Sequence, residues 1–467
     1  MKTRGGYTPK ISGRPSDILK KIPMSSVLKI DLWRNGRQYN PLVKEGQQVR
    51  IGDTIAETEL SGSKEQAGKN QQTLVLPSPA DGTVHLIKNK ETGMTVSIKL
   101  TDIGPSVDTN PARVKDPGRL TPGEARKALV ERGIWDYFWS SATKSTPGTD
   151  GEIKPKTIII NTVIAEPFRT RGKVVLQQFW HSIIKGMSYL PLLLADYGTV
   201  EFILTHRKDP IVQLMLKELT GKAWVKFHFI DVKYPVENHL LLDGLLRETK
   251  ANLAPDDDIW IMDIQTIEAI GIILGKGVPI SRRIVAMGGP AFPDPMHINV
   301  RIGTSLKDII PETVDLSSTM VLRGGLFTGT PVDPETDSVG FDDDAFFFLP
   351  IKLTREFVSF IRPGINKRSI FPNFMGKIDK DISTLMRGEL RPCIACGKCQ
   401  EICPVGLLPQ IIHRYLYSDR LDEAQKMGLD SCIDCNLCTF ICTSKIELRE
   451  QFFQARKVLR TEREGDV

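Results

Sequence analysis

The middle of the chain alternates short apolar runs with longer amphipathic stretches. Runs rich in β-branched residues predict strands, and apolar positions recurring every three to four residues predict helices. Strands are expected at 157–162, 200–206, 225–232, 258–264 and 284–287, with helices at 174–190, 210–219, 238–248 and 266–274 between them. Such an order predicts a parallel sheet covered on both faces, whose ligands dock beyond the carboxyl ends of the strands. The candidate ligand loops are therefore Asn161–Phe168, Thr205–Asp209 and Asp263–Thr266.

The pattern is different before this region. Residues 41–100 form short alternating runs separated by turn signals such as Pro79-Ala80-Asp81-Gly82, which predict antiparallel hairpins. This is typical of a barrel-sandwich hybrid of the biotinyl or lipoyl type. Lys64 could be the acylated lysine of a carrier domain, but it lies in a long polar loop and not at a tight hairpin. A docking module of the same shape is the favoured interpretation.

After the alternating region the pattern becomes β-rich again, with a short helix expected from Ser305 and a β segment at 345–353. The whole chain is thus predicted to be a multidomain protein of mixed α/β and α+β class. The expected parts are a barrel-sandwich at 1–105, an α/β domain at 120–292, a small β-grasp-like unit with its β segment at 293–355, and a helical domain at 380–460.

Composition, charge and the length of apolar runs limit the classes of function that this chain can have. Apolar residues make up 40% and charged residues 25% of the sequence, as in globular proteins. A net charge of +6 spread over 62 basic and 56 acidic residues predicts a mixed surface and no nucleic-acid partner. No apolar run approaches the ~20 residues that a membrane span needs, and no secretory signal is visible, so a cytoplasmic location is expected.

All eight cysteines lie in the last quarter of the chain, in two quartets that each read C-x2-C-x2-C-x3-C. They are Cys393, Cys396, Cys399 and Cys403, followed by Cys432, Cys435, Cys438 and Cys442. This spacing is that of ferredoxins with two clusters, and it predicts two 4Fe-4S clusters. Zinc sites are built from C-x2-C pairs and do not need a third cysteine at the same spacing. Disulfides are disfavoured because a cytoplasm is reducing.

In two-cluster ferredoxins the fourth cysteine of each run binds the other cluster. The rule assigns Cys393, Cys396, Cys399 and Cys442 to one cluster, and Cys432, Cys435, Cys438 and Cys403 to the second. Proline follows Cys403, whereas Thr443 follows Cys442. One or two helices are expected in the insert 404–431, and an amphipathic helix at 446–459 before a loose polar tail. No catalytic residue is assigned, since two adjacent clusters form an electron relay.

The sequence resembles two related families. The cysteine-rich stretch RPCIACGKCQEICPVGLLPQ with GLDSCIDCNLCTFICTSKIEL is similar to the C subunit of Rnf-type ferredoxin:NAD oxidoreductases, and the A subunit of sodium-pumping NADH:quinone reductases lacks such a tail. PSPADGTVHLI, ERGIWDYF and DIWIMDIQTIEAIGIILGKG look more like that A subunit. The resemblance implies a cytoplasmic subunit, peripheral on the inner face of the membrane, with membrane-embedded partner subunits and NADH, quinone or ferredoxin as the ultimate redox partner.

In the Rnf C subunit, the α/β domain is similar to the NADH- and FMN-binding subunit of respiratory complex I, in which a glycine-rich loop admits flavin and nicotinamide. Here the corresponding stretch is Gly133-Ile134-Trp135-Asp136-Tyr137-Phe138-Trp139, where aromatics replace the glycines. Backbone amides cannot then approach a phosphate closely, and this argues against NADH and FMN sites. The alternatives are a soluble cluster- and flavin-dependent reductase similar to cobalamin reductases, and a docking subunit whose clusters are structural.

Overall fold

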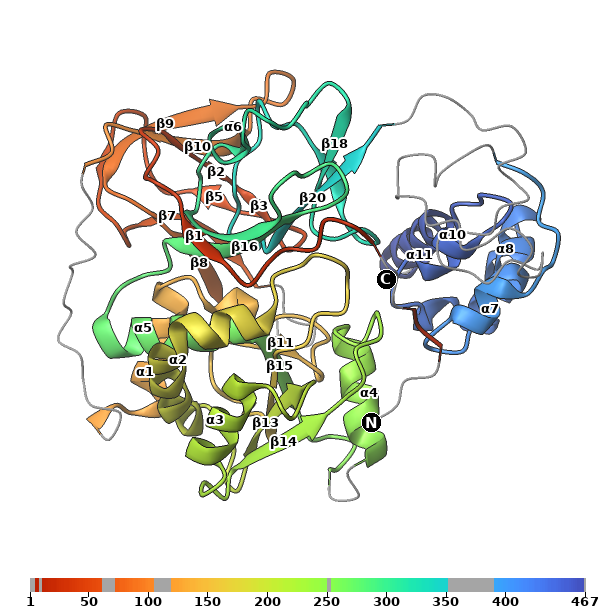
Figure 1. The fold of residues 1–467 in the computed structure, drawn as a ribbon, viewed down its shortest axis with the longest axis horizontal. Helices are drawn as coiled ribbons and strands as arrows, with labels where there is room; N and C mark the ends of the chain where they lie inside the picture. Colours follow the sequence, from red (N-terminus) through yellow and green to blue (C-terminus); the bar gives the residue numbers. More distant parts are fainter. Residues whose placement is uncertain are drawn as a thin grey trace.

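The computed structural model describes residues 5–7, 11–60, 72–104, 119–249, 253–351 and 390–465. A large body built from β-sheets and an α/β layer carries a small helical domain at one side (Figure 1). Lys64, the candidate acylation site, lies outside the described residues. The architecture is mixed α/β, with several sheets and a separate helical C-terminal region. This agrees with the expected fold class.

Two small antiparallel sheets and a hairpin form the N-terminal part. Buried side chains alternate with partly buried ones at the start of β9, where Val84 lies between Thr83 and His85, and this alternation explains why the period-two sequence pattern was visible. One sheet has the order β2 (Leu28–Asp31), β10 (Thr95–Thr101), β9 (Gly82–Lys88), β6 (Gln48–Val49); the other is β5 (Asn40–Pro41), β7 (Thr54–Glu59), β8 (Thr73–Pro77); the hairpin is β3 (Trp33–Arg34) and β4 (Arg37–Gln38).

The central sheet contains four parallel strands and one short antiparallel edge strand. Its order is β11 (Trp139–Ser140), β15 (Ile259–Asp263), β12 (Thr157–Asn161), β13 (Thr199–Leu204), β14 (Val225–Phe229). Every residue of β12, the central strand, is buried, which is why its sequence reads as a continuous apolar run. The four parallel strands are those that the sequence predicted at 157–162, 200–206, 225–232 and 258–264.

Helices cover both faces of this sheet, as predicted. Ile158 and Ile160 of β12 belong to the hydrophobic cluster that contains residues of α1, α2, α3 and α5, whereas Ile159 faces the cluster that contains α4. The helices are α1 (Pro122–Glu131), α2 (Gly172–Tyr189), α3 (Pro210–Leu219), α4 (His239–Thr249) and α5 (Ile264–Lys276), with short 3-10 turns η3 (Trp135–Tyr137) and η4 (Leu190–Leu192).

Three local features explain how these helices are placed. Gly186 of α2 and Gly271 of α5 let the two backbones touch: a Cβ atom at Gly186 would lie 2.1 Å from the carbonyl oxygen of Ile267. Thr121 and Glu124 form a capping box at the start of α1. Gly277 adopts the left-handed conformation that ends α5.

A six-stranded mixed sheet forms the third part of the body. Its order is β1 (Leu19–Lys21), β17 (Met296–Arg301), β16 (Arg282–Gly288), β20 (Ala345–Pro350), β18 (Thr319–Arg323), β19 (Thr330–Val332), and the short α6 (Leu306–Ile309) follows Ser305. The strand predicted at 284–287 is β16, and it lies in this sheet and not in the parallel one. Its existence was predicted correctly but its sheet was wrong, since a run buried on both faces fits the interior of either sheet.

The C-terminal domain consists of α7 (Lys398–Ile402), α8 (Pro409–Tyr417), α9 (Leu421–Lys426), α10 (Leu437–Ile441) and α11 (Leu448–Gly465), with a 3-10 turn η6 (Leu429–Ser431). The insert between the cysteine quartets forms two helices, as expected. The closing helix runs to Gly465, so the prediction of a loose tail from residue 461 was wrong for residues 461–465. Charged residues in that stretch favour helix as readily as they favour solvated coil.

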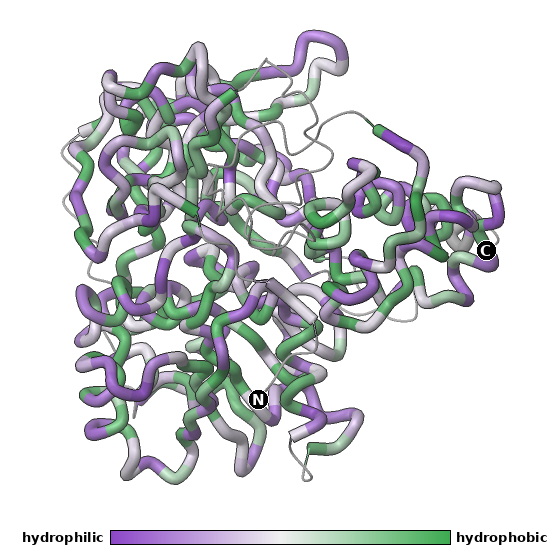
Figure 2. The backbone as a smooth tube through the Cα atoms, turned by 45° about the vertical axis from the view of Figure 1, so that its right-hand side comes forward, coloured by the Kyte–Doolittle hydropathy of each residue, from purple (hydrophilic) through white to green (hydrophobic). Residues whose placement is uncertain are grey.

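Hydrophobic and hydrophilic stretches alternate along the chain (Figure 2). Among the described residues, no helix is both long enough and apolar enough to cross a membrane.

Candidate iron–sulfur site and its junction with the body

The eight cysteines surround two cavities in the C-terminal domain. The first cavity is lined by Cys393, Cys396, Cys399 and Cys442. The second is lined by Cys403, Cys432, Cys435 and Cys438. Each cavity thus takes three cysteines from one quartet and the last cysteine from the other. That the four cysteines of each cavity bind one cluster stays a prediction. All eight cysteines are free thiols.

The two quartets reach this arrangement through the same backbone conformation. Ala395 and Gly397 in the first quartet, and Asp434 and Asn436 in the second, have positive φ angles, which turn the chain around each cavity. A five-residue helix follows, and its C-cap is the fourth cysteine: Cys403 has φ −63° and ψ 119°, and Cys442 has φ −62° and ψ 118°. Thr443 therefore follows a cysteine whose backbone matches that of the cysteine before Pro404.

The thiols stand around the cavities and do not converge on a point. No three histidine, cysteine, aspartate or glutamate side chains in the described ranges approach one another closely enough to bind a single metal ion. A cubane cluster needs a different arrangement, because each of its four irons takes one thiolate at a separate corner. The four-thiol cavities fit that group better than they fit zinc.

Burial changes the chemistry of the inner thiols. It raises the pKa of the Cys399 thiol to about 11 and that of Cys435 to about 12, and it raises the pKa of Cys438 as well. Buried thiols therefore keep their protons until a metal replaces them, because a bound cation deprotonates a coordinating thiol. Iron loading is expected to release protons and to stabilise this domain.

The two cavities differ in their surroundings. Cys393 and Cys396 at the first cavity are exposed, whereas none of the cysteines at the second is exposed. The second cavity is covered partly by the body: the Tyr234 hydroxyl donates a 2.7 Å hydrogen bond to the carbonyl oxygen of Cys435, and the Asn436 side-chain amide donates one of 2.7 Å to that of Phe327. These bonds attach the second cysteine loop to two parts of the body, the central domain at Tyr234 and the β18–β19 connection at Phe327.

Aromatic packing extends this junction. The Tyr234 ring stacks on Phe327, with ring centroids 4.6 Å apart, and Phe327 meets Phe440 of α10 edge-on at 5.0 Å. Backbone bonds from Gly6 to Ile402 and from Tyr7 to Tyr234 bind the N-terminal segment to both parts. One hydrophobic cluster runs from the parallel sheet into the helical domain. These residues could not be found from the sequence, because nothing in their local sequence shows that they meet.

A buried acidic site lies next to Phe327 of the junction, in the predicted ligand loop Asn161–Phe168. The Glu166 carboxylate accepts hydrogen bonds from the amides of Phe327 and Thr328, and its own amide donates to Glu237 at 2.7 Å. Burial raises the pKa of Glu237 to about 7, and Glu166 adds to that rise while Arg169 opposes it. This loop therefore holds the β18–β19 connection in place, and a ligand here stays a prediction.

The other two predicted ligand loops serve helix starts. Asp209 caps α3 and pairs with Lys173 at 2.8 Å, and Asp263 caps α5 through the amide of Thr266. Of the histidines, His228 lies 2.7 Å from Glu201, while His181 and His206 are exposed. A structural role for these loops and for His228 is consistent with these contacts.

The aromatic loop 133–139 is packed into the body. Trp135 and Phe138 are buried, and the Trp135 ring meets Phe138 and Trp260 at centroid distances of 5.0 and 5.5 Å. The buried carboxylate of Asp136 pairs with Arg37 at 2.6 Å and accepts from Thr146. Large side chains therefore occupy the stretch that corresponds to a glycine-rich loop in the resembling family.

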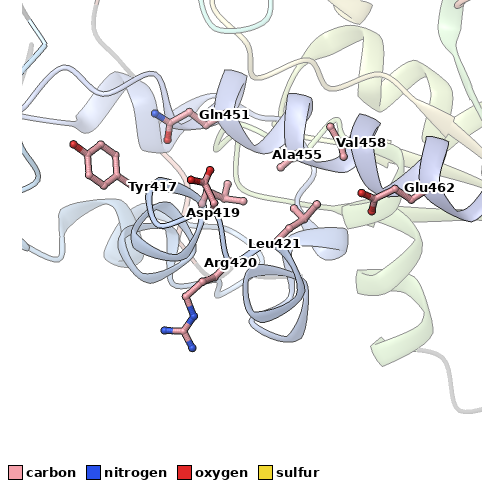
Figure 3. Close-up of a pocket in the computed structure, with 9 residues that line it drawn as sticks. Tyr417, Asp419, Arg420, Leu421, Gln451, Ala455, Val458 and Glu462 are labelled. Carbon is pink, nitrogen blue, oxygen red and sulfur yellow. The ribbon is translucent and has the colours of Figure 1, made fainter.

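An open groove on the helical domain lies between α8, α9 and α11 (Figure 3). Its walls carry Tyr417, Arg420 and Leu421 on one side and Gln451, Ala455 and Glu462 of α11 on the other. No cysteine lines it, so it is separate from both cluster cavities.

Arg456 of α11 places a cation beside the second cavity. It donates a 2.7 Å hydrogen bond to the carbonyl oxygen of Cys432 and pairs with Asp434. Replacing it by glutamine (R456Q) is expected to lower one of the two cluster midpoint potentials by on the order of 40 mV, the equivalent of about 1 kcal/mol for one electron, because a cation favours the reduced cluster. Redox titration would check this.

The matched control is R460Q, which removes an exposed arginine from the same helix. It should leave both midpoints unchanged. Equal effects of R456Q and R460Q would show that Arg456 does not act on the cluster.

Comparisons with known proteins give one match for the C-terminal domain and others for nearly the whole chain. A family model described as "4Fe-4S dicluster domain" matches residues 385–443. The A subunit of the Na(+)-translocating NADH-quinone reductase of Glaesserella parasuis serovar 5 (strain SH0165) is 23% identical over 459 residues, covering 94% of this chain and 95% of the relative. The corresponding protein of Pasteurella multocida (strain Pm70) is 24% identical over 462 residues, covering 95% of each.

The chain is therefore similar to that A subunit along nearly its whole length, and it carries a 4Fe-4S dicluster domain with eight cysteines. A solved structure, NAD+-reducing [NiFe]-hydrogenase in the air-oxidized state, aligns over 49% of this chain and 47% of that chain, at 14% identity and a TM-score of 0.37. A likeness this distant carries no argument about function.

Proposed function

We propose that this chain is a peripheral electron-transfer subunit of a membrane-bound, ion-translocating oxidoreductase of the Rnf or sodium-pumping NADH:quinone reductase type. It would lie on the cytoplasmic face of the membrane and pass electrons through two 4Fe-4S clusters. The observation that carries the proposal is the pair of four-cysteine cavities in one small domain, of which the second is attached to the body. The whole-length similarity to one component of a reductase supports the assignment to a complex.

The proposed ligand sets follow the cavities: Cys393, Cys396, Cys399 and Cys442 for the first cluster, and Cys403, Cys432, Cys435 and Cys438 for the second. A 4Fe-4S cluster supplies reversible one-electron chemistry. The chain's own groups hold the cluster ligands at fixed positions. Tyr234 and Asn436 fix the second cysteine loop against the body, so the second cluster would keep a constant position relative to the body.

The packing of the aromatic loop supports a relay role without independent NADH oxidation by this chain. The site of a glycine-rich loop is filled by Trp135 and Phe138, and a side chain at Gly133 would collide with Pro77, because its Cβ would lie 2.4 Å from the proline ring. The loop is thus held against the N-terminal sheets and leaves little room for a flavin phosphate. The electrons would come from another protein.

The test is anaerobic purification of the whole chain, with iron, acid-labile sulfide and flavin quantified together. We expect about eight irons and about eight sulfides per chain, as for two 4Fe-4S clusters, no stoichiometric flavin, reversible reduction by dithionite and no bleaching by NADH. Stoichiometric flavin with bleaching by NADH would instead support the soluble flavin-dependent reductase. Zinc in place of iron, or clusters that cannot be reduced reversibly, would overturn the relay.

A further inference from the structure

The start of α11 borders both cysteine cavities. Ile446 and Leu448 line the first cavity. Arg449, the next residue, lines the second, together with Phe452 one turn later. The backbone amide of Arg449 donates a 3.0 Å hydrogen bond to the hydroxyl of Thr439 in α10, the helix that follows the second cysteine loop. The backbone of Arg449 is therefore tied to the element that encloses the second cavity.

Arg449 contributes a side-chain donor to the wall of the second cavity. Besides the four cysteines, the described residues that line this cavity include three with polar side chains: Asp434, Asn436 and Arg449. Asp434 pairs with Arg456, and the Asn436 amide donates to the carbonyl oxygen of Phe327. The Nε atom of Arg449, in contrast, is buried and has no hydrogen-bond partner within the part of the chain that the structure describes.

A buried N–H group without an acceptor destabilises a fold, so such groups are rarely left unpaired in native proteins. The sulfurs of a 4Fe-4S cluster accept hydrogen bonds, and these bonds are one of the factors that set the cluster's reduction potential. The guanidinium of arginine also keeps its positive charge under all physiological conditions. The unpaired Nε of Arg449 therefore fits a cluster in the second cavity as its acceptor.

The second cluster has a particular need for such a donor. None of the cysteines at its cavity is exposed, whereas Cys393 and Cys396 at the first cavity are. Each electron adds a negative charge to a cluster, and burial away from water disfavours added charge. Burial alone therefore lowers the potential of the second cluster relative to the first. Lys398 lines the first cavity, but water at the open cysteine loop screens its charge more strongly.

We propose that Arg449 donates a hydrogen bond from Nε to a sulfur of the second cluster and thereby raises the midpoint potential of that cluster toward the potential of the first. This inference rests on the proposed relay function. One electron passes between the clusters, one being oxidised and the other reduced, with no bond formed or broken. Two clusters of similar potential exchange an electron in either direction. Without Arg449, the electron would stay on the first cluster.

The test is an anaerobic redox titration of the cluster-loaded full chain, followed by electron paramagnetic resonance. In R449Q we expect one of the two midpoints to fall and the other to stay unchanged. At a fixed potential, the ratio of reduced to oxidised second cluster should fall about tenfold, which corresponds to about 59 mV for a one-electron couple. The C442S background, which removes a ligand of the first cluster, should retain this shift. The C403S background, which removes a ligand of the second, should not.

R449K separates the hydrogen bond from the charge, because lysine restores the cation but has no N–H at the Nε position. It should recover only part of the shift, with iron content unchanged. R460Q removes an exposed arginine from the same helix and should shift neither midpoint.

Every other outcome decides against a stated part of the proposal. Unchanged midpoints in R449Q, an equal shift in R460Q, or a shift that appears only in the C403S background would overturn the role of Arg449 while the relay stands. Complete recovery in R449K would overturn the hydrogen bond. If R449Q loses iron, R449K decides alone, and wild-type midpoints in R449K would again overturn the bond. If the clusters of the unsubstituted chain cannot be reduced reversibly, the relay itself fails.

Discussion

Replacing Cys442 with serine is expected to empty the first cavity, although Cys442 belongs to the second sequence quartet. The first cavity is lined by Cys393, Cys396, Cys399 and Cys442, so loss of the last thiolate leaves one iron of that cluster without its cysteine. Iron should fall from about eight to about four atoms per chain, since each cluster holds four. The second cluster should remain, because its four cysteines are intact.

Alkylation of the folded protein identifies which cluster was lost. Thiols bound to iron resist iodoacetamide, so in C442S we expect labelling at Cys393, Cys396 and Cys399 and protection of the second set, read by peptide mass spectrometry. C403S is the matched variant, and it should expose Cys432, Cys435 and Cys438 instead. Unsubstituted protein should be protected at all eight. Labelling of Cys432, Cys435 and Cys438 in C442S would show that each quartet binds its own cluster and would contradict the crossed arrangement.

Replacing Trp135 with alanine is expected to lower the free energy of unfolding of the body by about 3–5 kcal/mol, the usual cost of truncating a buried tryptophan. The side chain is 1% exposed, packs on Phe138 and Trp260, and donates a 2.9 Å hydrogen bond from its indole nitrogen to the carbonyl oxygen of Pro147. Its removal leaves a cavity and an unpaired acceptor. Urea unfolding of the cluster-loaded chain, followed by far-ultraviolet circular dichroism, would measure the shift.

Trp33 provides the control, because it is 65% exposed in the short strand β3. W33A should change the free energy of unfolding by no more than about 0.5 kcal/mol, as is usual for surface positions. If W135A were as stable as W33A, the aromatic loop would not be part of the core. The space that it fills would then be open to a ligand, and a flavin could bind there.

Local patterns were enough to predict the separate elements. The four parallel strands and the helices between them were visible because a buried strand reads as a continuous apolar run and an amphipathic helix has a period near 3.6. Thr121 and Gly277 could be assigned as helix caps from sequence, since capping depends on residues within a turn of each other. The C-terminal end of α11 could not be predicted in this way, because residues 461–465 are all polar or glycine.

Contacts between distant segments could not be predicted in this way. The strand β16 was expected in the parallel sheet, yet it pairs with β17 and β20, and only the hydrogen-bond partners of a doubly buried strand decide its sheet. Tyr234 and Phe327 gave no sequence signal, although together they join the second cysteine loop to the body. Their roles arise from meeting residues that lie far away along the chain.

The sequence by itself determined the chemistry of the C-terminal domain: eight cysteines at ferredoxin spacing, where the ligand identity and the step between ligands are local properties that the cluster itself requires. Only the tertiary structure decided how the two cavities differ. One is bound to the body through Tyr234 and Asn436, and the other presents Cys393, Cys396 and Ile394 to the outside. The quartets are nearly identical in sequence pattern and backbone conformation, so their exposure depends on the packing of the rest of the chain against one of them.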